Sequence, residues 1–284
     1  MKRLIILMVL ALLPLTGSAQ AQIDTKKVKI SDFTRKVTKV VLTGNMFYDS
    51  SLQSEIASKW HVSPFEFCTM QEFESLKKDD SYYFLLTVAG QFRKESEPGL
   101  TFLTLVKGGE KAGTGISNML EVVSFPFASA EDPSGREYVF FSSILDIIQS
   151  HALASMERDI DGYTGLPNYT MNIYKSGDMT IVFSEGDLSS DVTGQVKNMY
   201  FDDKILVLVE ERADKYMTPE HGNTLVSYVV APTSAKAGSY CYKMLIDPQT
   251  STLYYFRKHK ISKKYGPGFL AEDIRRIATP RIKK

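Results

Sequence analysis

Few side chains in this sequence have the types and spacing that nucleophilic catalysis requires. Such catalysis needs a serine, cysteine or threonine beside a base, and the chain of 284 residues has four histidines and no Gly-x-Ser-x-Gly turn. We expect His61, just past a predicted helix, and His151, inside another, to be structural. His221 lies on a predicted loop near the acidic Glu210. The sequence therefore assigns no catalytic residue, and His221 and Glu210 are the only candidates for one.

Phosphate, metal and cofactor sites are not indicated either. The segment Gly108–Gly115 contains Lys111 but lacks the Gly-x-x-x-x-Gly-Lys-Ser/Thr order that aims amides and lysine at one phosphate, so we interpret it as a flexible hairpin loop. Asp159–Gly162 begins like a calcium loop, but Thr170 stands where a bidentate acid is needed. We therefore predict no metal and no cofactor. A carboxylate pair for glycoside hydrolysis must lie about 5–10 Å apart, which sequence spacing does not reveal.

The C-terminal segment is the most charged part of the chain. Arg257–Lys284 carries a net charge of +8, the stretch from Gln22 to Phe256 carries −9 and the first 21 residues carry +2, so the whole chain has a net charge of +1. A basic segment on an acidic body can bind anionic polymers, lipid head groups or an acidic protein. The alternative is a solvated strand and tail whose cations offset the acidic body. The predicted binding residues are Arg257, Lys258, Lys260, Lys263, Lys264, Arg275 and Arg276, with Tyr254 among the aromatic residues beside them.

The first residues have the pattern of a secretory signal peptide. Lys2 and Arg3 precede the apolar run Leu4–Leu13, and Ala19 and Ala21 form an Ala-x-Ala cleavage site, which predicts a signal peptide over 1–21. The apolar run is shorter than the roughly 20 residues that span a membrane, and a buried N-terminal helix is the alternative. We therefore expect a protein that is exported to the periplasm, the outer surface or the medium. We expect no nucleic-acid partner and no transmembrane segment after cleavage.

Composition and cysteine content exclude several classes of protein. A chain that is 43% hydrophobic and 24% charged is not disordered, collagen-like or polytopic in a membrane. Its two cysteines, Cys68 and Cys241, do not make a disulfide framework, and both lie in strand-like stretches. In an exported protein they are either two separately buried thiols or one bridge, and the sequence leaves both open.

Periodicity and turn residues predict the same order of elements in both halves of the chain. Each half reads β-α-β-α-β-β-β-α, which we interpret as a tandem duplication in an α/β fold with mixed sheets. One larger mixed-sheet domain is the alternative. The predicted domains are 22–160 and 171–284, with a linker over 159–171. The first half is expected to have strands at 37–43, 65–67, 82–89, 100–106 and 119–125, and helices at 47–60 (capped by Asp49 or Ser50), 70–76 and 136–158. The second half is expected to have strands at 179–184, 204–209, 224–231, 240–246 and 253–259, and helices at 188–199, 213–217 and 269–277.

This order of elements resembles the small α/β domain of periplasmic envelope proteins such as the N-terminal domain of TolB and the CsgG and LpoB group. The leader ending in Ala-Gln-Ala-Gln and the body rich in Tyr, Phe and Lys are also similar to exported proteins of the Bacteroidota. The resemblance implies a fold for each half and no residue roles, because a fold alone does not carry a function.

These observations predict a protein that binds a partner and catalyses no reaction. We expect an exported envelope or secreted protein that binds a protein or an anionic surface polymer. The alternative is a hydrolase with a site between the two repeats, since ligands favour such junctions. His221 clustered with Glu210 or Asp203 beside a deep pocket would favour the hydrolase.

Overall fold

The structure is a computed structural model that describes residues 30–92, 97–158, 162 and 164–282. The predicted signal peptide and its cleavage site lie outside the described residues. The two predicted repeats lie almost entirely within them, so their elements can be compared strand by strand.

Within the described residues, the first half contains strands and α-helices in the predicted order, with short 3-10 turns between them. Boundaries agree with the prediction to within one or two residues for most elements. The elements are η1 (Phe33–Arg35), β1 (Val37–Val41), α3 (Met46–Lys59), β2 (Phe65–Cys68), α4 (Met70–Leu76), β3 (Tyr82–Gly90), β4 (Leu100–Lys107), η2 (Glu110–Thr114), η3 (Ile116–Asn118), β5 (Leu120–Ser129) and α5 (Arg136–Glu157).

The second half repeats this order. Its first α-helix is shorter than the predicted 188–199, because η5, a bridge between Leu188 and Phe269 and a turn at 190–191 precede it. The elements are η4 (Leu166–Lys175), β6 (Thr180–Ser184), η5 (Glu185–Asp187), α7 (Gly194–Tyr200), β7 (Ile205–Leu208), α8 (Glu210–Asp214), β8 (Thr224–Val230), β9 (Tyr240–Asp247), β10 (Thr252–Lys260) and α9 (Ala271–Ile282).

The two halves share one sheet topology. The first sheet has the order β2-β1-β3-β4-β5 and the second has the order β7-β6-β8-β9-β10. In each sheet the first strand along the chain pairs in parallel with its two neighbours, and the remaining pairs are antiparallel. Each strand of one half therefore has a counterpart of the same position and direction in the other, as a tandem repeat requires.

Local side-chain chemistry sets where α3 begins. The prediction that Asp49 or Ser50 caps this helix is wrong. Asn45 is the N-cap, and its Oδ1 accepts hydrogen bonds from the second and third helical amides at 3.1 and 3.2 Å. The Asp49 carboxylate instead accepts from the amides of Thr43 and Gly44, both at 2.8 Å, and so fixes the turn between β1 and α3.

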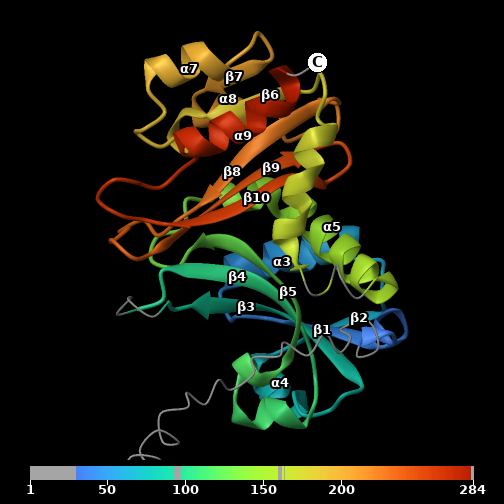
Figure 1. The fold of residues 1–284 in the computed structure, drawn as a ribbon. Coiled ribbons are helices and arrows are strands. Elements are labelled where there is room, and N and C mark those ends of the chain that lie inside the picture. Colours follow the sequence, from blue (N-terminus) through green and yellow to red (C-terminus); the bar gives the residue numbers. More distant parts are fainter. Residues whose placement is uncertain (1–29, 93–96, 159–161, 163, 283–284) are drawn as a thin grey trace, which may run out of the picture.

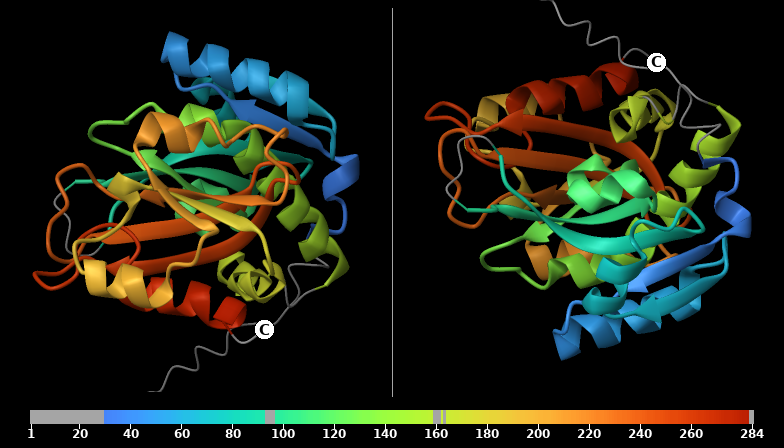
Figure 2. Two further views of the ribbon diagram at one scale, coloured as in Figure 1. Left: turned by 90° about the horizontal axis from the view of Figure 1, so that it is seen from above. Right: turned by 90° about the horizontal axis from the view of Figure 1, so that it is seen from below.

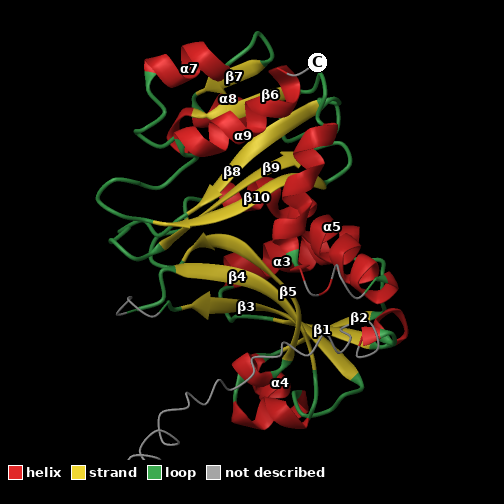
Figure 3. Cartoon of the chain, viewed as in Figure 1, coloured by secondary structure: helices red, strands yellow, loops and turns green. Residues whose placement is uncertain are grey.

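The two sheets stack face to face around a shared core (Figures 1 and 3). Tyr83 and Leu85 of the first sheet and Met244 and Ile246 of the second belong to one cluster of buried side chains. Helices α3 and α5 add their apolar faces to the same cluster. Because this core draws on both repeats, burial of apolar surface holds them together as one body.

The contact between the repeats joins unlike faces of the two sheets. The first sheet turns toward its neighbour the face that carries α3 and α5, and its other face carries α4 through Phe73 and Phe84. The second sheet turns toward the first the face opposite α9, whose Ile274 and Ile277 pack on the outer side. In Figure 2, α3 and α9 accordingly lie at opposite edges of the molecule.

Helix α5 is central to this arrangement. It is the one helix among the described residues that is long and apolar enough to cross a membrane, but 61% of its most apolar window is buried inside the protein. Phe140 and Ile144 are fully buried in the shared core. These properties are those of a core helix.

Two segments predicted as loop and linker have defined structure. Gly108–Gly115, predicted as a flexible loop, contains all of η2 and leads into η3. Of the predicted linker over 159–171, residues 159–161 and 163 lie outside the described residues, and 166–171 belong to η4, which lies along the outer edge of β10. There Thr170 Oγ1 donates to the carbonyl of Phe256 at 2.6 Å and accepts from its amide at 3.1 Å. Thr170 thus satisfies backbone groups that an edge strand would otherwise expose.

The cysteines are free thiols in different sheets. Cys68 ends β2 and Cys241 lies in β9, and both are buried. Burial raises the pKa of each thiol to about 11. Of the two arrangements that the sequence left open, the structure shows the separately buried thiols.

Candidate functional site

The predicted basic residues do not form one surface. Arg257 and Arg276 both reach Glu272 on α9, at 3.7 and 2.6 Å, and Arg257 also lies 3.6 Å from the buried Asp273. Arg275 is exposed on the same helix. These three arginines therefore lie over the outer face of the second sheet, where two of them are neutralised by acidic neighbours.

The remaining predicted residues divide between a loop and the opposite face. Lys263 and Lys264 are exposed in the loop after β10, where the Lys264 ammonium lies 4.9 Å from the Tyr265 ring centre. Tyr254 packs against the outer core of the second half rather than standing among the lysines. Lys258 and Lys260 alternate with Arg257 along β10, so they point away from α9, toward the side of the first repeat.

Lys258 and Lys260 stand on a row of aromatic rings. Lys258 lies opposite Tyr242 in the strand register, and Lys260 lies opposite Tyr240. The Lys258 ammonium is 5.3 Å from the Tyr240 ring centre and 5.9 Å from that of Tyr242, and the Lys260 ammonium is 5.5 Å from that of Tyr240. Such distances allow cation–π attraction. Among the described residues, no carboxylate forms an ion pair with either lysine.

The row of rings continues into the first repeat. The ring centre of Phe92, just after β3, lies 4.6 Å from that of Tyr240. The ring centre of Phe102 of β4 lies 5.6 Å from that of Tyr242. We call the set of Phe92, Phe102, Tyr240, Tyr242, Lys258 and Lys260 the lysine–aromatic face. It is built by strands of both repeats, so it exists only when they are stacked.

Two cavities open beside the lysine–aromatic face. One, of about 340 Å³, lies between β3–β5, η3 and Tyr242, and its wall is mainly apolar. The other, of about 250 Å³, is lined by Lys258 and Tyr242 together with His151 and the chain at Gly165–Pro167. Phe102, Glu121, Ser124 and Tyr242 line both cavities, so the two concave surfaces are adjacent, and Lys258 lines the smaller one.

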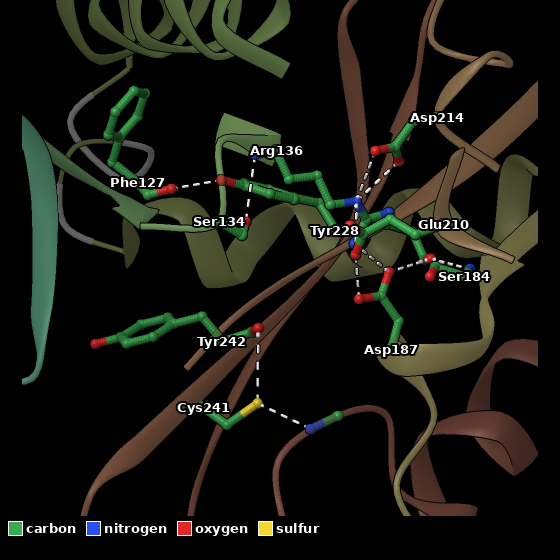
Figure 4. Close-up of polar contacts among 12 residues, drawn as sticks. Phe127, Ser134, Arg136, Ser184, Asp187, Glu210, Asp214, Tyr228, Cys241 and Tyr242 are labelled. Carbon is green, nitrogen blue, oxygen red and sulfur yellow. Dashed lines mark hydrogen bonds and ion pairs between the residues drawn. The ribbon is translucent and has the colours of Figure 1, made fainter. Parts of the chain in front are cut away.

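A second group of polar residues joins the repeats from inside. Arg136, the first residue of α5, is only 6% exposed. Its Nη1 donates to both carboxylate oxygens of Asp187 at 2.8 and 3.0 Å, and its Nε donates to those of Asp214 at 2.8 and 3.1 Å. Its Nη2 donates to the carbonyl of Ser227 at 2.9 Å. Figure 4 shows the contacts of Arg136 with Asp187 and Asp214. We call Arg136, Asp187, Asp214 and Ser227 the Arg136 cluster.

The Arg136 cluster is charged and closed. Burial alone would lower the pKa of the guanidinium, but Asp187 and Asp214 raise it above its ordinary value, so Arg136 stays charged. The Ser227 hydroxyl donates to Asp187 at 2.5 Å, and the guanidinium lies 5.3 Å from the Phe140 ring centre and 5.9 Å from that of Tyr228. Each charged group is thus already hydrogen-bonded within the protein, as a structural link between repeats requires.

The position of this cluster is one where α/β proteins often bind ligands. Asp187 follows the carboxyl end of β6, where the connections of β6 and β7 leave the sheet toward opposite faces. A cavity of about 230 Å³ lies there, lined by Arg136, Glu137, Asp187 and Glu210 among others. Arg136 could not be identified from the sequence, because its partners lie 51 and 78 residues away in the other repeat.

The two candidate catalytic residues do not meet. The Glu210 carboxylate is 3.9 Å from Arg136 Nε and its side chain is 54% exposed. The His221 ring lies against Tyr216, with ring centres 4.5 Å apart. Among the described residues, no hydrogen bond or ion pair joins His221 to Glu210 or Asp203, and no group of three metal-ligating side chains was found.

Sequence reasoning placed Lys258 and Lys260 in a binding surface but missed Tyr240 and Tyr242. A usable signal was present: Asp247, Pro248 and Gln249 are residues typical of a turn, and they lie between two predicted strands. Tyr240 and Tyr242 alternate in the first strand, and Lys258 and Lys260 alternate in the second. Pairing across that turn would have placed both tyrosines beside the lysines.

Comparison with known proteins gives this chain no relatives from which a role could be transferred. No protein-family model, no curated protein and no solved structure matches it significantly.

Proposed function

We propose that this chain is an exported, non-catalytic binding protein that either stays in the cell envelope or is secreted. Its lysine–aromatic face would bind an anionic surface polymer, or a partner protein that presents acidic groups in a similar way. The single observation that carries the proposal is the placement of two lysines, without acidic partners in the described structure, over two tyrosine rings.

The chemistry of the face suits an acidic polymer. The ammonium groups of Lys258 and Lys260 are available to carboxylates or phosphates, whereas Arg257 and Arg276 are already paired with acidic residues. The tyrosine rings beside them offer flat apolar surface on which sugar rings or peptide side chains can pack. Charge and surface complementarity of this kind give binding that weakens with salt.

The hydrolase alternative receives no support from a specific contact. The arrangement that would favour it, His221 beside Glu210 or Asp203, does not occur among the described residues. The carboxylates of the Arg136 cluster are hydrogen-bonded to Arg136 and Ser227. We therefore do not carry the hydrolase forward.

Binding to a defined polymer tests the proposal. The mature chain would be titrated with polygalacturonate, a carboxylated polysaccharide, and with uncharged dextran at low and high salt. We expect binding to polygalacturonate only, and we expect Lys258→Gln combined with Lys260→Gln to weaken it about tenfold or more, equivalent to about 1.4 kcal/mol. The double variant should also reduce the dependence of binding on salt.

A matched variant separates the face from general charge. Arg275→Gln combined with Arg276→Gln removes the same two positive charges from α9, on the opposite side of the second sheet. We expect this variant to bind like the original chain. Equal weakening by both variants would show that net charge, and not the lysine–aromatic face, attracts the polymer, and would overturn the proposal.

A further inference from the structure

The larger cavity beside the lysine–aromatic face is a surface pocket with a mainly apolar wall. Its volume is about 340 Å³, within the range of pockets that hold small molecules. The apolar side chains at its wall are Val88, Phe92, Phe102, Val106, Ile116, Met119 and Tyr242.

Comparison of the repeats shows that this cavity is not a requirement of the fold. In the second repeat, β9 and β10 are joined by a short turn at residues 248–251, and the corresponding sheet face is covered by the first repeat. In the first repeat, the connection between β4 and β5 is longer and forms η2 and η3. Ile116 and Ser117 of η3 line the cavity, so the additional segment builds one of its walls.

Charge is distributed unevenly around the opening. Tyr242 forms part of the wall, and the Lys258 ammonium lies 5.9 Å from its ring centre. Phe92 forms another part and contacts Tyr240, over which Lys260 also lies. Glu121 is exposed at the rim. Glu121 also lines the smaller cavity together with Lys258, so the opening carries one carboxylate against the two ammonium groups of Lys258 and Lys260. The excess of positive charge attracts an anionic group.

From this juxtaposition we propose that the cavity and the two lysines together bind a single-chain anionic amphiphile, a molecule with one acid group joined to an apolar chain. The chain lies in the cavity against Val88, Phe102 and Val106, and the acid lies at Lys258 and Lys260. The inference rests on the proposed function, because both assign the acid to the same lysines, and it adds an apolar requirement that a polymer does not have.

Titration calorimetry with dodecanoate below its micelle concentration tests the inference. Dodecanol supplies the chain without the acid, and acetate supplies the acid without the chain. We expect dodecanoate to bind at least about tenfold more tightly than either, because each buried methylene and the charge contribute separately. Binding of dodecanol as tight as that of dodecanoate would overturn the inference.

Two cavity-filling variants with one matched control locate the chain. Val88→Phe places a ring in the cavity from β3, and Ser117→Tyr does so from the exposed η3. The control is Val139→Phe, which makes the same Val-to-Phe substitution at an exposed position on α5. We expect both cavity variants, but not the control, to weaken dodecanoate about tenfold or more while leaving polygalacturonate binding unchanged. Thermal unfolding would confirm that each variant is folded.

The outcomes distinguish failure of this inference from failure of the proposed function. If dodecanoate binding is unaffected by both folded cavity variants, the amphiphile site is wrong, whether or not the lysines bind polymer. If Lys258→Gln with Lys260→Gln alters neither ligand, the proposed function fails as well. Binding to vesicles of phosphatidylglycerol without binding to free dodecanoate would point to a membrane surface and would also overturn the inference.

Discussion

Among the described residues, Arg136 makes more polar contacts with the other repeat than any other side chain. It begins α5, a place where a positive charge opposes the helix dipole, and it is buried. Asp187 and Asp214 of the other repeat compensate for both costs. In this packing of the repeats, Nε, Nη1 and Nη2 of Arg136 all have acceptors in the second repeat.

Loss of Arg136 should be strongly destabilising. Arg136→Met leaves the carboxylate of Asp187 buried and without its cation, and we expect the free energy of unfolding to fall by about 3–5 kcal/mol. Urea denaturation measures this change. Lys204→Met is the matched control, because Lys204 pairs with Asp178 at the surface at 3.6 Å, and its loss should cost less than about 1 kcal/mol. Similar values for the two variants would contradict the role assigned to Arg136.

At this scale the sequence predicted surface charge better than buried charge. Lys258 and Lys260 could be predicted because they belong to a local excess of basic residues. Arg136 could not, because nothing in its neighbourhood shows that it meets Asp187 and Asp214 from the other repeat. The same applies to Lys243, a lysine within an apolar strand, whose buried partner Asp273 lies on α9.

At the scale of elements, η4 protects an edge that would otherwise be exposed. Strand β10 ends the second sheet, and the backbone of Phe256 is hydrogen-bonded by Thr170. Asn172 donates to the carbonyl of Leu253 on the same edge at 2.9 Å. A segment that looked like a linker therefore serves as a substitute for a further strand.

Thr170→Val should open this edge without changing the volume of the side chain. The variant removes the hydroxyl that accepts from the Phe256 amide, so we expect that amide to exchange its hydrogen markedly faster. Native-state hydrogen exchange measures the rate, and amides of β9, which lies between β8 and β10, serve as the internal reference. An unchanged Phe256 amide would show that η4 does not protect β10.

Strands were easier to predict than the ends of helices and the nature of connections. The apolar runs of 82–89 and 224–231 identify buried strands by themselves, because their β-branched and aromatic residues suit no other environment so well. Helix ends depend on single caps, and Asn45 was overlooked beside Asp49. The glycines and proline of 108–115 and 165–167 indicated loops, whereas packing against neighbouring strands gives these segments 3-10 structure.

At the scale of the whole molecule, the two repeats depend on one core. Tyr228, Met244 and Ile246 are at most 2% exposed because the first repeat covers them. Duplication of the element order could be predicted from the sequence, but the way in which the copies stack could not. Strands that are apolar on both faces do not indicate which face packs against the other sheet.

The intact chain should therefore unfold as a single unit. Trp60, the one tryptophan, is buried in the shared core and reports on the first repeat, while circular dichroism reports on both. We expect the two signals to change at the same urea concentration, because separation of the repeats would expose a large apolar surface. A second transition, seen by circular dichroism after Trp60 has become exposed, would show instead that the second repeat is stable alone.

The stacking of unlike faces has a consequence for the ancestry of the molecule. A single copy of this unit that associated with itself through the same contact would be heterologous, with each subunit offering a free face to the next, and it would grow as an open filament and not close as a dimer. Fusion of two copies limits growth only if the terminal faces are blocked. The insertion that forms η2 and η3 covers part of one terminal face. The other terminal face carries α7 and α9, the counterparts of α3 and α5, which take part in the contact between the repeats. The insertion at η2 and η3 is therefore the feature that distinguishes a terminal face from its counterpart at the contact.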